Sequence, residues 1–370
     1  MINTLFAAAV RLFMSLVLWG TFLAVFGVGT AYAQIGGQET FTFLKLPVSA
    51  RTAALGGVSL ALADDDVNLA ATNPAALTAS VDRHLAFNIA AIAPTVTAGY
   101  GVYAQHFAKA GLTAHIGVQF LNYGTMTRTN EAGDKEGDFS AAENAVTLGI
   151  GKTVNERLRF GVNLRYISSR LDSYQSSGLT GDIAVMYDDT THGITLALVA
   201  ANVGGQLKSY TAGNIEQVPT DVQVSFAKRF KHLPFRFLAT YHHLQKYNIR
   251  YDDPTAVQTS TIFGAQTTDA ANQSPVIDNL ARHFVFGGEL LFGKRENFRI
   301  RFSYNHLQHA ELTVKDTRGL AGFALGAGIK TNKFRIEYAH TWRHFAGGTD
   351  YFSVAFPLGE FVKKRTKAEG

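Results

Sequence analysis

The sequence of 370 residues contains no cysteine and only eight prolines. An exported chain without cysteine cannot use disulfide bonds for stability, and a closed sheet of paired backbone groups is one alternative source. After Gly29 no apolar run reaches the roughly 18 residues that a helix needs to cross a bilayer. If the protein lies in a membrane, it therefore crosses it without helices.

The chain also lacks a block of positive charge before its last residues, although its net charge is +5 and its isoelectric point is about 9.2. Lysines and arginines are scattered through alternating segments and turns, and the first basic block is Lys363-Lys364-Arg365. A nucleic-acid partner is therefore not expected. The 12% of aromatic residues and the 35 glycines favour a β-sheet over a helical enzyme.

The first 33 residues have the features of a secretory signal peptide. Arg11 precedes an apolar run from Leu12 to Gly29, and the segment ends in Ala31-Tyr32-Ala33. A retained membrane anchor is the alternative, because the apolar run is nearly long enough to span a bilayer. No basic stop-transfer flank follows, so cleavage is favoured, and position 34 is glutamine rather than the cysteine of a lipid anchor. We therefore expect export.

From about residue 84 onward the chain alternates between apolar and polar residues. In 298–305 one face carries Phe, Ile, Phe and Tyr, and the other carries Arg, Arg, Ser and Asn; 158–166, 222–226 and 333–338 follow the same scheme. This period of two predicts β-strands. In a soluble sandwich the apolar face would point to a core, whereas in a membrane barrel it would point to lipid.

The number of strands and the lengths of their connections favour the barrel. We expect about fourteen strands, near 84–92, 95–107, 112–121, 144–151, 158–170, 178–187, 193–203, 220–229, 234–244, 281–293, 298–307, 320–330, 333–344 and 350–358. The even-numbered connections are all short, and the long ones (122–143, 204–219, 245–280 and 308–319) are all odd-numbered. An antiparallel barrel in the outer membrane, with short periplasmic turns, long external loops and both termini periplasmic, produces this asymmetry.

Residues 34–83 differ from the rest, because they are rich in alanine and too few to fold alone. Ser49–Gly57 is a small-residue stretch that ends in two glycines and predicts a short helix. We interpret 34–83 as a plug inside the barrel. The expected organisation is a signal peptide (1–33), a plug (34–83), an all-β transmembrane barrel (84–358) and a polar basic tail (359–370). The candidate plug residues are Arg51, Gly56, Gly57, Asp64, Asp65, Asp66, Asn73 and Pro74.

The polar faces of the strands carry charges that would meet this plug. Asp64-Asp65-Asp66 lacks the spacing of a calcium loop, so we expect lumen arginines to neutralise it. The candidate lumen charges are Arg159, Arg165, Asp182, Arg236, Glu289, Arg299, Arg301, Arg335 and Glu337.

The N-terminal residues also resemble a known family. Gln34–Phe41, Phe43–Pro47 and Ser49–Gly57 resemble the start of the PorQ-type outer-membrane proteins of the type IX secretion system. Asp64-Asp65-Asp66 and Asn73-Pro74-Ala75 resemble the plug of the wider PorV/PorQ group of FadL-like barrels, which have fourteen strands.

The resemblance implies a role as an anchor in the outer membrane. Proteins of this type hold a PorZ-like surface protein in the attachment complex that processes exported cargo, together with the sortase PorU and the shuttle PorV. The alternative is a FadL-like channel for hydrophobic small molecules. The external segments 122–143 and 245–280 are the expected contact sites of a partner, and the polar composition of 245–280 favours the anchor over a hydrophobic-ligand pocket.

Enzyme chemistry and cofactors are not expected. Gly149-Ile150-Gly151-Lys152-Thr153 lacks the first glycine of a phosphate-binding loop, because that position is Val146. Gly-x-Ser-x-Gly is absent. The adjacent His242 and His243 should face opposite sides of a strand and so should not share a metal ion. We expect no metal site.

Overall fold

A computed structural model describes residues 39–250, 275–312, 319–344 and 347–362. The predicted signal peptide (1–33), the first residues of the predicted plug (34–38), most of 245–280, part of 308–319 and most of the predicted tail lie outside these ranges. No helix within the described ranges is both long enough and apolar enough to cross a membrane.

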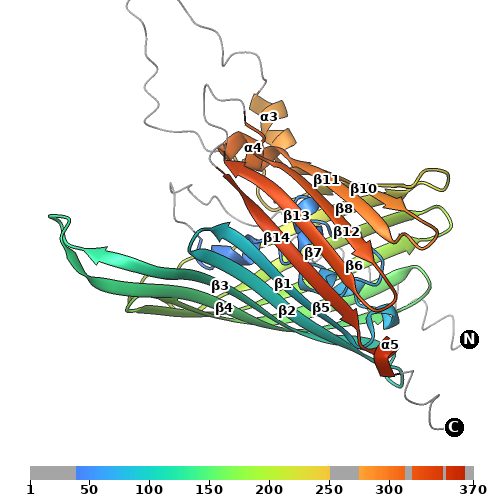
Figure 1. Cartoon of the computed structure of the whole chain (residues 1–370), viewed down its shortest axis with the longest axis horizontal. Helices are drawn as coiled ribbons and strands as arrows, with labels where there is room; N and C mark the ends of the chain where they lie inside the picture. Colours follow the sequence, from blue (N-terminus) through green and yellow to red (C-terminus); the bar gives the residue numbers. More distant parts are fainter. Residues whose placement is uncertain (1–38, 251–274, 313–318, 345–346, 363–370) are drawn as a thin grey trace, which may run out of the picture. The chain divides into compact units, whose positions relative to one another are not determined.

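Fourteen antiparallel strands form one closed barrel (Figure 1), and the predicted fold is confirmed. Each strand pairs with its neighbours in sequence, and β1 pairs with β14 to close the sheet, with Leu85 opposite Phe356. The strands are β1 (His84–Ala93), β2 (Val96–Phe107), β3 (Leu112–Thr129), β4 (Lys135–Thr153), β5 (Leu158–Leu171), β6 (Tyr174–Asp189), β7 (Ile194–Lys208), β8 (Asp221–Arg229), β9 (Phe235–Tyr241), β10 (Phe284–Phe292), β11 (Phe298–Asn305), β12 (Phe323–Lys330), β13 (Arg335–His344) and β14 (Gly347–Pro357).

The two faces of the wall differ in polarity. In β4 the outward side chains of Val146, Leu148 and Ile150 are exposed, whereas Glu143 and Thr147 point inward and are buried. In the other strands too, large apolar side chains are exposed on the outside, whereas the lumen is lined by polar side chains together with buried apolar ones such as Ile167 and Met186. A closed sheet with an apolar outer face is the architecture of an outer-membrane barrel.

The barrel has two unlike ends. At one end the strands are joined by short connections, such as 108–111 between β2 and β3, and β1 begins and β14 ends there; we call this the short-turn end. At the other end, the long-loop end, lie the connections 209–220, 242–283 and 306–322. The helices α3 (Pro275–Arg282) and α4 (His306–Leu312) lie within the last two of these connections (Figure 1), and α5 (Gly359–Val362) follows β14.

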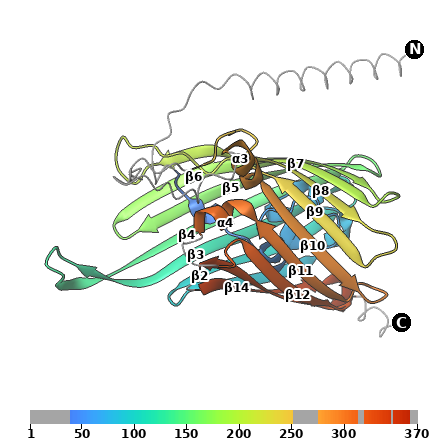
Figure 2. The same cartoon turned by 90° about the horizontal axis from the view of Figure 1, so that it is seen from above.

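One predicted loop is a hairpin instead. The segment 122–143 was expected to be an irregular insertion, but β3 continues to Thr129 and β4 begins at Lys135. The two strands project beyond their neighbours (Figures 1 and 2), and the side chains near their tip are exposed on both faces. Asn130 closes the tip because its Oδ1 accepts hydrogen bonds from the amides of Ala132 and Asp134. An isolated two-stranded ribbon is stable here because the barrel anchors its base.

Residues 39–83 run through the lumen (Figure 2) as short helical turns joined by extended chain. These are η1 (Thr42–Lys45), α2 (Ala50–Ala54), η2 (Val67–Ala71), η3 (Pro74–Ala76) and η4 (Ala79–Val81). In α2 the hydroxyl of Ser49 accepts a hydrogen bond from the amide of Thr52, and the hydroxyl of Thr52 accepts one from the amide of Ser49, so a capping box begins the helix. Gly56, at φ 88°, follows the last turn in the left-handed conformation that suits glycine.

The plug passes from one end of the barrel to the other. Glu39 forms a β-bridge with Gln217 at the long-loop end, and Asp82 accepts the amide of His106 at the short-turn end. Glu39, the first described residue, therefore lies at the end of the barrel opposite to the start of β1. The predicted periplasmic termini of the mature chain, at residues 34 and 370, lie outside the described residues, so their placement stays a prediction.

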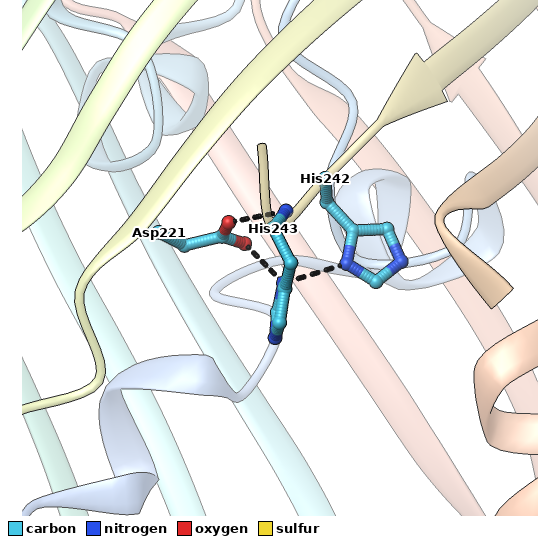
Figure 3. Close-up of side chains that lie close together, drawn as sticks. All are labelled: Asp221, His242 and His243. Atoms are coloured by element: carbon cyan, nitrogen blue, oxygen red, sulfur yellow. Dashed lines mark hydrogen bonds and ion pairs between the residues drawn. The ribbon is translucent and has the colours of Figure 1, made fainter. Parts of the chain in front are cut away.

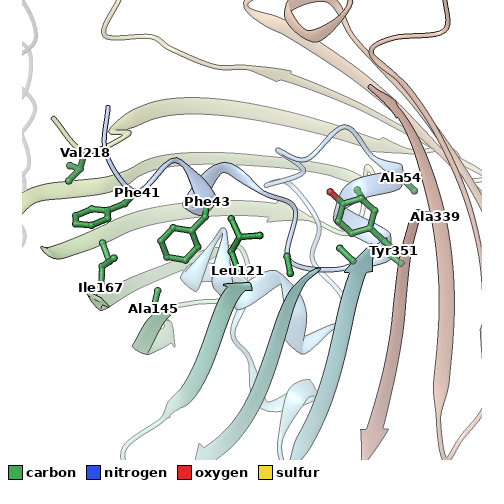
Figure 4. Close-up of a cluster of buried hydrophobic side chains, with 13 residues drawn as sticks. Phe41, Phe43, Ala54, Leu121, Ala145, Ile167, Val218, Ala339 and Tyr351 are labelled. Carbon is green, nitrogen blue, oxygen red and sulfur yellow. The ribbon is translucent and has the colours of Figure 1, made fainter. Parts of the chain in front are cut away.

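The plug and the wall share a continuous core. Phe41 and Phe43 of the plug pack with Leu121 and Ile167 of the wall, and Ala54 packs with Ala339 (Figure 4). Two further clusters join Leu60, Leu62 and Leu69 to β6–β9, and Val67 and Leu77 to β1 and β2. Each buried apolar side chain of this size contributes about 1.5–3 kcal/mol, so the plug is an integral part of the fold.

Candidate functional site

Arg51 of α2 is the centre of a buried set of ion pairs. Its guanidinium donates to both carboxylate oxygens of Asp64 at 2.8 and 2.6 Å, and to Asp66 at 3.2 Å. From the wall, Glu289 accepts hydrogen bonds from Arg51 Nε at 3.0 Å and Nη2 at 3.1 Å. The side chains of Arg51, Asp66 and Glu289 are fully shielded from solvent. Burial of this kind requires that every charge has a partner.

The wall supplies cations on adjacent strands. Glu289 of β10 accepts hydrogen bonds from Arg236 of β9 and Arg301 of β11, each at 2.8 Å. Arg301 also donates to Glu337 of β13 at 2.8 Å. These residues come together because each points inward in its strand and the register places Arg236, Glu289 and Arg301 side by side.

Asp65 extends the set toward the short-turn end. Its carboxylate accepts hydrogen bonds from Lys330 at 2.5 Å and from Arg335 at 2.7 Å, and Arg335 lies 3.3 Å from Asp66. Arg299 lies 3.9 Å from Asp64. The lumen charge cluster thus consists of Arg51, Asp64, Asp65, Asp66, Arg236, Glu289, Arg299, Arg301, Lys330, Arg335 and Glu337.

The cluster keeps the plug carboxylates ionised. Burial raises the pKa of Asp65, but the charge of Arg335 and the hydrogen bond from Lys330 outweigh burial and lower this pKa to about 2. The same balance, between burial and the charge and hydrogen bonds of Arg51, holds the pKa of Asp64 well below its usual range. At neutral pH both residues therefore act as fixed negative charges that bind the plug to the wall.

A second polar group joins the plug to β5–β7. Arg165 and Asp182 form an ion pair at 3.0 Å, and Arg165 also donates to the carbonyl of Ala71 at 3.2 Å. Asn163 donates to Asp182 at 2.9 Å and to the carbonyl of Ala70 at 3.0 Å. Side chains of the wall thus donate hydrogen bonds to plug carbonyls that have no partner within a regular helix.

Asn73 and Pro74 form a tight turn against the wall. The Asn73 side chain accepts the amide of Ala75 at 3.0 Å and donates to the carbonyl of Leu60 at 2.7 Å. Gly161 of β5 has no side chain at the point where the Pro74 backbone touches the wall. In the same way, Gly56 contacts the Val285 side chain, whereas Gly57 lies near Pro47.

The structure brings six of the nine predicted lumen charges together in the lumen charge cluster. Arg165 and Asp182 instead pair with each other. Arg159 pairs with Asp188 at 2.8 Å, close to the short-turn end. Lys330 was missed, although it ends an alternating strand. Asn163 was also missed, because only charged residues were selected on the polar faces.

The prediction for His242 and His243 is wrong. β9 ends at Tyr241, so strand alternation does not extend to these residues, and His243 has a left-handed φ of 58°. Their Nδ1 atoms consequently lie 2.8 Å apart. Asp221 at the start of β8 lies beside them.

Two cavities adjoin the described part of the plug. A cavity of about 10 Å³ lies between the plug and β1–β3, next to Leu46 and Asn88. A larger one, about 360 Å³, opens at the short-turn end and is lined by Asp65, His84 and Arg335. The fold and the site define a plugged transmembrane β-barrel.

Comparison with known proteins gave structural matches but no sequence family. No family model matches the chain, and no curated protein matches it. Among solved structures it is similar to the CymD monoaromatic hydrocarbon channel (TM-score 0.49, 11% identity, 83% of this chain and 96% of that one). It is also similar to the Pseudomonas putida toluene transporter TodX (0.46, 11%, 82% and 95%) and to a Pseudomonas aeruginosa FadL homologue (0.46, 10%, 83% and 97%). With TM-scores below 0.5, these matches add no argument about function.

Proposed function

We propose that this chain is a non-conducting outer-membrane anchor that holds a PorZ-like surface protein in the attachment complex of a type IX secretion system. The observation that carries the proposal is the contact of the plug with the whole circumference of the wall. The three apolar clusters include wall residues from β1–β9, β13 and β14, and the lumen charge cluster adds β10 and β11. Ala54 adjoins Gly326 of β12.

A plug held in this way favours a fixed scaffold over a pore. Opening an aqueous path would separate Arg51 from its three carboxylates, and breaking a buried pair costs about 3–5 kcal/mol. The surface features for a partner are the projecting tip of the β3–β4 hairpin and the helices of the long-loop end. The N-terminal resemblance supplies the identity of the complex and the chemistry of the partner.

The test combines a binding assay with a conductance assay. The full chain in detergent-solubilised membranes should retain the surface protein, identified by mass spectrometry as a type IX attachment component. A variant in which 124–140 is replaced by a two-residue turn should lose it. The matched control Lys109→Ala changes an exposed side chain in the 108–111 connection at the short-turn end, away from the hairpin, so it should retain the partner.

In planar bilayers the purified protein should give no steady ion current. A steady current would contradict the anchor. So would a barrel that is purified from its native membrane without any attachment component bound to it.

A channel for hydrophobic small molecules is the second candidate. The cavity of about 10 Å³ favours it, because this cavity is lined by Leu46 and Val48 of the plug and by the lipid-facing Ile89 of the wall, which is 52% exposed. Ligand pockets usually measure about 300–1,000 Å³, so transport would require the plug to move. Fatty acid or hydrocarbon that co-purifies in one-to-one ratio, detected by mass spectrometry after extraction, would favour this function over the anchor.

A further inference from the structure

Asp221, His242 and His243 form a compact group at the long-loop end (Figure 3). Asp221 is the first residue of β8, and the two histidines directly follow β9. Their potential ligand atoms, one from each residue, all lie within 4.8 Å of one another. The group therefore links the base of the β7–β8 connection to the base of the β9–β10 connection.

The spacing of the ligand atoms is close to that of a metal site. His242 Nδ1 lies 2.8 Å from His243 Nδ1, which lies 3.2 Å from Asp221 Oδ2. In a tetrahedral zinc site with bonds of about 2.0–2.1 Å, ligand atoms are about 3.3 Å apart. The third separation, between the ligand atoms of His242 and Asp221, is at most 4.8 Å, so these two groups would approach each other by up to about 1.5 Å to admit the ion. Two ring nitrogens and a carboxylate oxygen that converge in this way are an environment for a cation.

Hydrogen bonds from neighbouring residues hold the three groups in place. Asp221 Oδ1 accepts the backbone amide of His243 at 2.6 Å, and Oδ2 accepts Gln223 Nε2 at 2.7 Å. The backbone carbonyl of His242 accepts His283 Nδ1 at 2.7 Å, and its amide donates to the carbonyl of His283 at 3.0 Å. Such outer partners orient the ligands of metal sites.

We propose that Asp221, His242 and His243 bind one zinc ion with a fourth position open to water. Imidazole and carboxylate ligands suit Zn²⁺, and three protein ligands plus water complete a tetrahedral shell. The fourth position is reachable because the side chains of His243 and Asp221 are 24% and 13% exposed. The ion links the end of the β7–β8 connection to the start of the β9–β10 connection, and so stabilises the long-loop end.

Cobalt provides the direct measurement, because tetrahedral Co²⁺ absorbs visible light strongly. The full chain, folded in detergent and purified with a tag free of histidine, should bind one equivalent of Co²⁺ with this absorption. One equivalent of Zn²⁺ should displace it. Absence of the absorption band at saturating Co²⁺, or binding that does not stop at one equivalent, would overturn the proposal.

Variants assign the ligands. His242→Ala, His243→Ala and Asp221→Asn should each weaken Zn²⁺ binding by at least about 100-fold, more than the loss of an outer partner does. Asp221→Asn keeps an oxygen for the His243 amide but loses one of the two acceptor oxygens, so its melting temperature without metal is measured as well to separate loss of the ligand from loss of folding. The matched control is His340→Ala, since His340 is paired with Asp350 at 2.8 Å on another part of the barrel. Unchanged binding in His243→Ala, or equal loss in His340→Ala, would show that the ion binds elsewhere.

Discussion

Arg51 forms ion pairs with three carboxylates, because it lies where the plug meets the wall. Replacing it with alanine leaves Asp64, Asp66 and Glu289 without their shared partner in a buried site. We expect Arg51→Ala to lower the free energy of unfolding by about 3–5 kcal/mol. The loss is measured by titrating the detergent-folded protein with urea. The folded fraction at each urea concentration is read from the heat-dependent migration of the protein on gels.

The control for this prediction is Arg128→Ala in the β3–β4 hairpin. Arg128 pairs with Asp172, but both side chains are more than one-third exposed. An exposed pair contributes less than about 1 kcal/mol. Equal losses in the two variants would contradict a special role for burial at Arg51.

The lowered pKa of Asp65 predicts how the free energy of unfolding depends on pH. Its pKa is lowered from 3.8 to about 2 in the folded protein, so between these values the unfolded chain binds a proton that the folded chain does not. The contribution of Asp65 to the free energy of unfolding is therefore fully present above about pH 4 and is lost as the pH falls toward 2. The lowered pKa of Asp64 acts in the same direction.

Asp65→Asn should reduce this acid-side loss, and melting temperatures recorded between about pH 5 and pH 2 would show a shallower fall than in the unmodified chain. Identical slopes would refute the assignment.

Alternation along the strands was sufficient to place wall charges such as Arg301 and Glu289 on the inner face. It could not place Arg51 among them, because the path of the plug depends on packing with the whole barrel. It failed for His242 and His243, since β9 ends at Tyr241, three residues before the predicted end of this strand at 244.

At the scale of elements, the η3 turn packs against a position of β5 that has no side chain, Gly161. A Cβ on Gly161 would overlap with the backbone of Pro74 and Ala75. Gly161→Ala should therefore displace η3 and lower the free energy of unfolding by about 1–3 kcal/mol. Urea titration measures the change, and proteolysis within 39–83 should become faster.

Gly205→Ala in β7 is the matched control, because a Cβ there meets nothing within 4 Å. A comparable loss in this variant would indicate a general effect of replacing strand glycines instead of contact with the plug.

The number of strands was predictable because turns and alternation recur along the chain. The length of the β3–β4 hairpin was not, because its tip has no buried face and therefore no apolar period. Helices α3 and α4 were missed for a related reason, since each is only eight or seven residues long and lies in a segment that was interpreted as loop.

For the whole molecule, the plug determines whether the lumen conducts ions. The inner face of the wall carries many buried polar and charged side chains, and the plug contacts residues of the strands around it. Removing 39–83 should therefore leave an open polar pore that gives a steady current in planar bilayers. Folding of this variant is checked by its heat-dependent migration on gels.

The control here is the variant with a shortened β3–β4 hairpin, which keeps the plug and should remain silent. A folded barrel that lacks 39–83 and still passes no current would contradict the plug as the closing element.

The path of the plug also bears on how the protein assembles. Glu39 lies at one end of the lumen and the start of β1 lies at the other, so the intervening chain runs the full depth of the barrel. The sheet closes where β1 pairs with β14. The segment is therefore either enclosed when this seam forms or threaded through one end of a closed barrel, and by either route the charges of α2 enter the lumen before they are paired.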